Sequence, residues 1–168
     1  MLLCGELVRA ANQGTDIFIT IGEKNSNNKH ESTKTRKPEN NNVTMGRSFE
    51  QVSADIIGAA LAVHRELGPG FLESIYDAAM RVSLRHRSIP FQSQFPVSVS
   101  FEGELVGDAR IDLLVAEQVI LELKAVESLR DIHFVQLKSY LRATGLQVGL
   151  LFNFNASTLV IKRIVLHR

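Results

Sequence analysis

Three charged residues lie inside two segments that otherwise consist of aliphatic and β-branched residues. The stretch 110–124 reads RIDLLVAEQVILELK and carries Asp112, Glu122 and Lys124 where buried strands are expected. A buried carboxylate is costly unless it is paired, hydrogen bonded or bound to a metal. Two carboxylates and a lysine at one point would suit the hydrolysis of a phosphate ester. The carboxylates would hold Mg²⁺ or Mn²⁺, and the lysine would orient an attacking water or stabilise developing negative charge on the phosphate.

Whether these side chains meet depends on the register of the hairpin that the stretch forms. If Asp112 lies opposite Glu122, the connecting loop is residues 116–118 or two residues longer, and Arg110 lies across from Lys124. A regular two-residue turn would put the two carboxylates on opposite faces. We therefore expect a loop with an odd number of residues, unless a bulge shifts the register. The alternative interpretation is an amphipathic hairpin that carries all four charges on a solvated face.

Two helices are expected before the hairpin. Residues 48–67 start with a capping box, continue with apolar residues at helical spacing, and end at a Gly-Pro-Gly sequence. A second helix is expected at about residues 72–87. Its spacing places Ile75, Ala79 and Val82 or Leu84 on the inner face.

Strands and one more helix account for the rest of the chain. Alternation predicts a strand at residues 97–101, followed by the two strands of the hairpin. A third helix is expected at about residues 129–143, and two last strands at 148–152 and 159–166. The order is helix, helix, three-strand meander, helix, strand, strand. It predicts an α/β fold with a mixed central sheet flanked by helices.

The first 44 residues differ in composition from the remainder. Their tract EKNSNNKHESTKTRKPENNN has no apolar anchor, so we expect residues 1–44 to be a disordered or weakly structured extension. The segment TDIFITI within it could form a short strand without an evident partner. We expect residues 45–168 to form the autonomous domain, with Met45 as a candidate true start.

Composition limits the classes of protein to which the chain can belong. The 168 residues include one cysteine, Cys4, which excludes an intramolecular disulfide and a cysteine-based metal site and favours a reducing cytoplasm. No apolar run is long enough to span a membrane. From Met45 onward, 13 Lys or Arg are balanced by 13 Asp or Glu. The domain therefore lacks the broad basic surface of a general nucleic-acid binder, and any phosphate-binding surface must be local.

Several motifs resemble those of one superfamily. Asp112 followed by the Glu-Leu-Lys at 122–124 resembles the bipartite signature of the PD-(D/E)xK nucleases, although an isoleucine replaces the proline. Gln136 and Tyr140 resemble the QxxxY element of the exonuclease-like branch. Residues 70–76 match the GxxExxY motif that names a bacterial family placed in this superfamily. The resemblance covers about residues 48–163 and implies a restriction-endonuclease-like core.

The resemblance also implies roles for the charged residues. Asp112 and Glu122 match the metal ligands, and Lys124 matches the catalytic lysine. Glu73 matches the helix carboxylate that completes the metal site or positions its water. The cofactor implied is Mg²⁺, with Mn²⁺ as an alternative.

Other residues are expected to bind or position the substrate. Gln136 and Tyr140 match residues that position the lysine or touch phosphate, although they could simply dock their helix on the sheet. Tyr76 is expected to pack and hydrogen bond near the site. Arg110 could contact a phosphate or a neighbouring carboxylate. His64 and His133 are expected to be structural, as a lone histidine beside an apolar stripe usually is.

The function implied is that of a Mg²⁺-dependent nuclease that hydrolyses phosphodiester bonds in DNA, or in RNA. The alternative is a non-catalytic module of the same fold that binds nucleic acid or a protein. A domain that works only within a larger protein complex is a third reading. The sequence predicts no oligomeric state.

Overall fold

The computed structural model describes residues 8–10, 17–19 and 47–167. Within the first 44 residues it describes two short antiparallel strands, β1 (Val8–Ala10) and β2 (Ile17–Ile19). The strand expected in TDIFITI therefore pairs with the segment at 8–10. The polar tract that we expected to be disordered and the boundary at Met45 lie outside the described residues.

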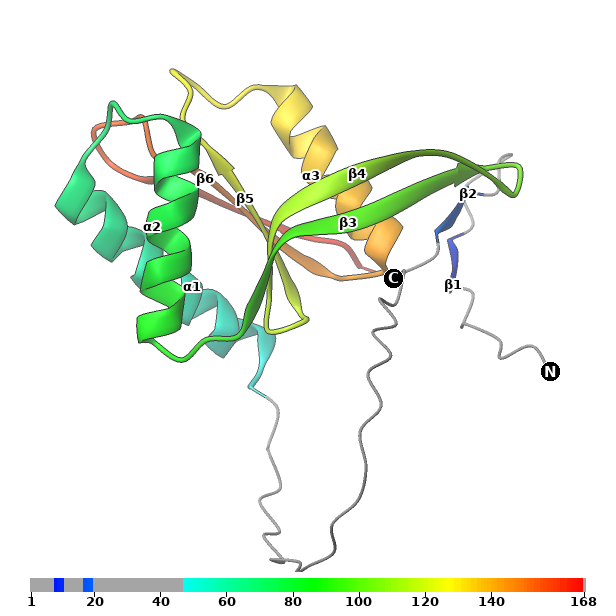
Figure 1. The fold of residues 1–168 in the computed structure, drawn as a ribbon, viewed down its shortest axis with the longest axis horizontal. Helices are drawn as coiled ribbons and strands as arrows, with labels where there is room; N and C mark the ends of the chain where they lie inside the picture. The colour runs from blue at the N-terminus through cyan, green and yellow to red at the C-terminus, as the bar shows by residue number, and fades with distance from the viewer. Residues whose placement is uncertain (1–7, 11–16, 20–46, 168) are drawn as a thin grey trace, which may run out of the picture.

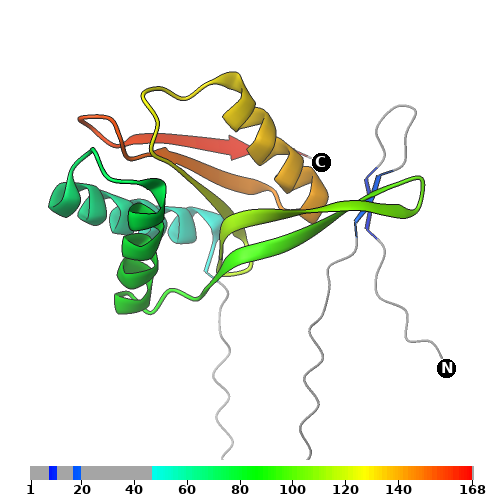
Figure 2. The same ribbon diagram turned by 45° about the horizontal axis from the view of Figure 1, so that its top comes forward.

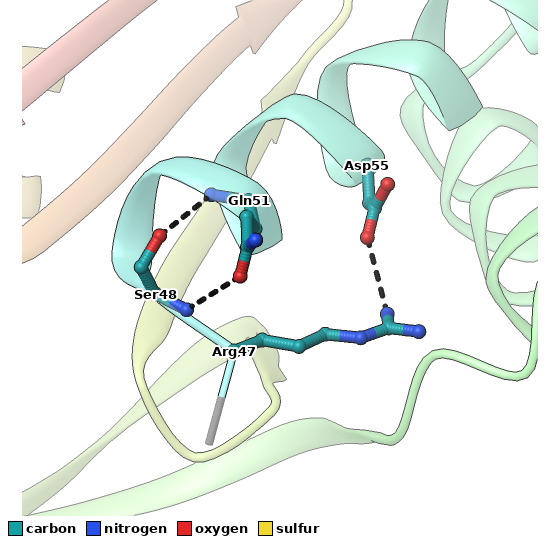
Figure 3. A network of polar contacts seen from close by, with 4 residues as sticks. All are labelled: Arg47, Ser48, Gln51 and Asp55. Carbon is teal, nitrogen blue, oxygen red and sulfur yellow. Dashed lines mark hydrogen bonds and ion pairs between the residues drawn. The ribbon is translucent and has the colours of Figure 1, made fainter. Parts of the chain in front are cut away.

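The first helix of the domain begins as its sequence predicts. In α1 (Phe49–Leu67), the Ser48 hydroxyl accepts a hydrogen bond from the Gln51 N–H at 3.3 Å, and the Gln51 side chain accepts one from the Ser48 N–H at 3.0 Å (Figure 3). An ion pair of 3.1 Å between Arg47 and Asp55 crosses the same helix start. The two hydrogen bonds of the capping box satisfy backbone donors that the start of a helix leaves unpaired.

The inner face of the second helix, α2 (Glu73–His86), agrees only in part with the prediction. Leu84 is fully buried and Ala79 packs against the core, as expected, but the other two predicted residues face outward. Ile75 and Val82 are 45% and 42% exposed, whereas Tyr76 and Met80 are fully buried. The buried Ser83 donates a hydrogen bond to the Ala59 carbonyl of α1 at 3.3 Å, so a polar residue lies in the helix interface. Ile75 and Val82 were misplaced because the prediction gave no weight to aromatic and hydroxyl side chains that find partners in the core.

Five strands form one mixed sheet in the order β3-β4-β5-β6-β7. The first three strands form the antiparallel meander predicted from the sequence, and β6 and β7 are also antiparallel. Strands β5 and β6 are parallel, with α3 (Asp131–Thr144) as the crossover between them. The strands are β3 (Phe91–Phe101), β4 (Glu104–Val115), β5 (Val119–Lys124), β6 (Val148–Asn153) and β7 (Val160–Val165).

Helices cover both faces of the sheet (Figures 1 and 2). Helices α1 and α2 pack on one face, where Leu121 and Leu150 belong to the larger core cluster. Helix α3 packs on the other face, where Ile120, Leu137 and Leu151 belong to a second cluster. Residues of β5 and β6 are therefore almost wholly buried from both sides, as central strands of such a fold should be. The predicted α/β fold is confirmed.

The hairpin of β3 and β4 extends beyond the sheet as a long arm, away from α2 (Figures 1 and 2). Side chains at its tip are exposed, Phe101 to 48% and Leu105 to 63%. Strand β2 lies beside β3. None of the described helices is both long and apolar enough to cross a membrane.

The spacing between α3 and the sheet depends on Gly149 in β6. A Cβ added at Gly149 would lie 2.7 Å from a methyl carbon of the buried Leu137 and 2.9 Å from its Cγ. We expect Gly149→Ala to lower the free energy of unfolding by about 1–3 kcal/mol through overpacking. In contrast, a Cβ added at Gly58, an exposed position of α1, meets nothing within 4 Å. Gly58→Ala should raise the free energy of unfolding by about 0.5–1 kcal/mol. Urea unfolding of both variants would test this, and equal effects would contradict the packing argument.

Candidate active site

The candidate site forms where β4 and β5 diverge. Leu113 pairs with Leu121 and Val115 with Val119, and three residues, 116–118, connect the strands. The predicted register and the odd loop length are confirmed. One step further along the same register, Asp112 comes beside Glu122.

Asp112 lies at an interruption of the sheet. Its neighbours Ile111 and Leu113 pair with Phe95 and Ser93 of β3, but Asp112 has no partner in that ladder, where Gln94 adopts a φ of 52°. On the other side of β4, the last residue that pairs with β5 is Leu113, so Asp112 lies just beyond that ladder. The Asp112 carboxylate accepts a hydrogen bond of 2.9 Å from the Leu123 N–H. The Asp112 side chain thus takes the place of a backbone partner for Leu123. The same hydrogen bond holds the Asp112 carboxylate at the end of β5.

Glu122 is the most deeply buried carboxylate among the described residues, with 1% of its surface exposed. One carboxylate oxygen lies 3.4 Å from the Lys124 ammonium, and the other, Oε1, is buried without a hydrogen-bond partner. Burial, reinforced by the charge of Asp112, raises the pKa of Glu122 to about 8. An unsatisfied buried acceptor of this kind costs free energy that a cation or a proton would recover.

Lys124 lies on the same face of β5 as Glu122, two residues away. Burial lowers the pKa of its ammonium group, but the charges of Glu122 and Glu73 outweigh that effect, and the net shift is upward. Lys124 therefore remains a cation inside the protein. The backbone that follows Lys124 is tied to the next strand, because the Asn153 side chain accepts a hydrogen bond from the Val126 N–H and donates one to its carbonyl.

Helix α2 contributes the predicted Glu73 at its first residue. Partial burial raises the pKa of Glu73, the charge of Lys124 opposes this, and the charge of Asp112 reinforces it. The backbone of Ala125 also hydrogen bonds the Glu73 carboxylate and lowers its pKa. The structure therefore brings Glu73 to the end of β5, as the resemblance implied.

Asp77, one helical turn after Glu73, is a site neighbour that the sequence reading missed. Burial raises its pKa, an ion pair of 2.9 Å with Arg81 opposes the shift, and the charge of Asp112 adds to it. Its Oδ1 is buried and has no hydrogen-bond partner. The spacing of four residues from Glu73 was the available signal, but an Asp-Arg pair at i and i+4 resembles an ordinary surface pair.

Helix α3 brings Gln136 and Tyr140 together, with the Gln136 amide donating a hydrogen bond of 3.0 Å to the Tyr140 hydroxyl. No hydrogen bond among the described residues links this pair to the charges of β5. His133, in the first turn of α3, has its pKa lowered by burial and by the charges of Lys124 and Arg130. The His133 Nδ1 accepts a hydrogen bond of 3.1 Å from the Arg130 N–H at the start of α3, which is a structural role of the kind expected for it.

Arg110 does not lie across from Lys124, so that prediction is wrong. The residues of β4 that precede Leu113 in the chain pair with β3 and not with β5. Arg110 is one of them: it pairs with Pro96 and is exposed. The expectation assumed that the β4–β5 ladder would continue for three more residues. A phosphate contact by Arg110 stays a prediction.

Tyr76 and His64 hold the scaffold around the site. The buried Tyr76 hydroxyl donates to the Gly68 carbonyl at 2.7 Å and accepts from the Phe71 N–H at 3.2 Å, so it fixes the loop that leads into Glu73. His64 lies 2.9 Å from the Ala156 carbonyl, a contact that joins α1 to the β6–β7 loop. Both side chains pack near Phe154.

The donor chemistry of this site suits a divalent cation. Asp112 and Glu122 offer the carboxylate oxygens that Mg²⁺ and Mn²⁺ prefer, and the orphaned Oε1 of Glu122 is the atom that most needs a partner. In the ranges that the structure describes, no three His, Cys, Asp or Glu side chains form a group that could hold a metal as they stand. Asp112 and Glu122 would hold the ion, and Glu73 is the third ligand predicted.

Without a metal, Glu122 should make stability depend on pH. The folded protein keeps the Glu122 proton up to about pH 8, whereas an unfolded chain loses it near 4.5. The folded state binds more protons in this window, so stability should fall as pH rises through it. We expect Glu122→Gln to remove this slope and to stabilise the protein by about 1–4 kcal/mol above pH 8.

Urea unfolding in EDTA across this pH range provides the measurement. Glu104→Gln, an exposed site on the arm, is the matched control and should retain the wild-type slope. An unchanged slope in Glu122→Gln would show that Glu122 is already ionised without a metal.

The comparisons with known proteins identify the family. The PD-(D/E)XK nuclease superfamily matches residues 50–164, a range that contains α1 through most of β7 and every residue of the site. No curated protein and no solved structure matched the chain. The matched range covers more than half of the sequence, and the mixed sheet flanked by helices is consistent with the fold of that superfamily. The chain belongs to the PD-(D/E)XK nuclease superfamily.

Proposed function

We propose that residues 45–168 form a Mg²⁺-dependent nuclease, active also with Mn²⁺, that hydrolyses phosphodiester bonds in DNA or RNA. The observation that carries the proposal is the buried Oε1 of Glu122, which lacks a partner although Asp112 and Lys124 lie beside it. Within the superfamily we place the chain in the GxxExxY family, on the motif at 70–76. The single cysteine favours a cytoplasmic location.

The roles of the acidic residues follow from their positions. Asp112 and Glu122 would hold the ion, and Glu73, at the end of β5, would complete its shell or orient the attacking water. When bound, Mg²⁺ would supply a Lewis acid and acidify water for in-line attack on the phosphate. The raised pKa of Glu73 makes its carboxylate a stronger proton acceptor than an ordinary glutamate.

Lys124 would stabilise the negative charge that develops on the phosphate. Its side chain is only 13% exposed, so little water screens its charge. Gln136 and Tyr140 would contact the phosphate or hold Lys124 from α3, and Tyr76 would act only through the loop before Glu73. Arg110 would contact a more distant phosphate from the arm.

A second candidate is a non-catalytic module that binds nucleic acid or a protein partner. The balance of 13 basic and 13 acidic residues from Met45 onward favours it, because phosphate affinity depends on basic charge. A protein partner within a complex would supply the missing charge. The complete set of Asp, Glu and Lys favours the nuclease.

Cleavage assays test the nuclease proposal directly. Labelled DNA and RNA, single- and double-stranded, would be incubated with the protein and Mg²⁺ or Mn²⁺. We expect Lys124→Ala to lower the cleavage rate at least about a hundredfold, the usual loss when a transition-state charge partner is removed. Lys162→Ala, at an exposed position of β7, is the control and should cleave at the wild-type rate. Metal-dependent cleavage that is unchanged in Lys124→Ala would refute this mechanism.

Metal binding can be measured without cleavage. We expect Mn²⁺ or Mg²⁺ to raise the melting temperature of the wild type by several degrees, because an ion that binds only the folded state stabilises it. Asp112→Asn should lose most of this increase. Asp108→Asn lies on the same strand, is exposed and should keep it. An equal increase in both variants would place the ion elsewhere and favour the non-catalytic module.

A further inference from the structure

Two large apolar side chains lie on the surface directly before Glu73. Phe71 is 48% exposed and Leu72 is 76% exposed, the highest value among the exposed large hydrophobic residues of the described chain. We call these two residues the apolar lip. Exposed apolar side chains at a functional site commonly mark a surface that a ligand covers.

The lip is held in place by buried groups. The Phe71 N–H donates to the Tyr76 hydroxyl, and the Phe71 ring contacts the Tyr76 ring edge to face, with centroids 6.3 Å apart. Tyr76 in turn stacks on Phe154 at 4.6 Å. A ring fixed in this way can bind a flat ligand with little loss of conformational entropy.

The same contacts connect the lip to the charged site. The Phe154 N–H donates to the Lys124 carbonyl at 2.8 Å, so Phe71 is linked to Lys124 through two packed rings. Leu72 adjoins Glu73, whose carboxylate bonds the backbone of Ala125. A protein or second copy that covered the lip would therefore also cover Glu73, the exposed first residue of α2. A bound substrate is the occupant that fits this position.

The chemistry of that substrate follows from the two kinds of surface that adjoin here, the charged site and the apolar lip. Charged groups suited to a phosphate adjoin apolar groups suited to an uncharged planar ring, which is the pattern of a nucleotide with an unstacked base. In a duplex the base faces are hidden, and affinity depends on basic charge that this domain does not have in excess. Stacking on an aromatic side chain needs no such charge.

We propose that the substrate is single-stranded nucleic acid, and that a base next to the cleaved phosphate stacks on Phe71 while Leu72 covers its edge. This inference rests on the proposed function, because it assigns the phosphate to the site of Asp112, Glu122 and Lys124. It adds that the enzyme prefers unpaired strands, or unpaired ends, to a continuous duplex.

A binding experiment tests the lip apart from catalysis. Fluorescein-labelled single strands and blunt duplexes of the same sequence would be titrated with the full chain in EDTA, which prevents cleavage. We expect the wild type to bind the single strand more tightly than the duplex. The double variant Phe71→Ala with Leu72→Ala should lose about tenfold in single-strand affinity, within the range for one stacked base.

The arm offers a matched control, Phe101→Ala with Leu105→Ala. Phe101 is 48% exposed, as Phe71 is, and the arm tip lies at the other end of the molecule from α2. This control should bind the single strand as the wild type does. Phe71→Trp should keep the affinity, since it preserves an aromatic face. Cleavage with Mn²⁺ should follow the same order.

Three results would overturn the inference. Equal or tighter wild-type binding to the blunt duplex is the first and needs no variant. The second is undiminished single-strand affinity in the lip variant. The third is a dimer, detected by light scattering, that the lip substitutions dissociate, since the lip would then bind a second copy. If the protein cleaves no substrate but its single-strand binding depends on the lip, the nuclease proposal fails. The lip would still be a binding site for single-stranded nucleic acid.

Discussion

The arrangement of the site depends on one hydrogen bond, from the Leu123 N–H to the Asp112 carboxylate. At this point β4 turns away from β5 to form the arm with β3, and a backbone N–H in the middle of the domain would lose its partner. The Asp112 side chain satisfies that donor, so the strands can separate without the cost of a buried unpaired group. Glu122, the residue before that N–H, lies at the divergence with one carboxylate oxygen unpaired.

The site is therefore maintained at a cost to stability. Glu122 is buried among like charges, and the single cation of Lys124 lies near three acidic side chains that raise its pKa. Such a cluster is tolerated because the two core clusters on either face of the sheet fix β5 and β6 in position. A divalent cation would remove the excess negative charge. The same groups that destabilise the metal-free fold would then become its ligands.

The sequence predicted the β4–β5 hairpin well because strand geometry has a strict period. Alternation alone relates Glu122 to Lys124, and one register brings Asp112 beside Glu122. Alternation could not predict where the β4–β5 ladder ends. The point at which β4 and β5 diverge depends on β3 and on the interruption of its ladder with β4 at Gln94. For that reason Arg110 was misplaced. Asp77 was missed for another reason: its burial comes from tertiary packing, which an Asp-Arg pair on a helix does not reveal.

The rotation of α2 links the acidic residues and the apolar lip to one cause. Because Tyr76 stacks on Phe154, and not Ile75, the helix turns Glu73 and Asp77 toward β4 and turns Ile75 outward. Tyr76 can face the core only because its hydroxyl bonds the loop that carries Phe71. The interaction that orients the acids thus also fixes the lip beside them. A helix placed by aliphatic packing alone, with Ile75 inward, would have moved Glu73 away from Lys124.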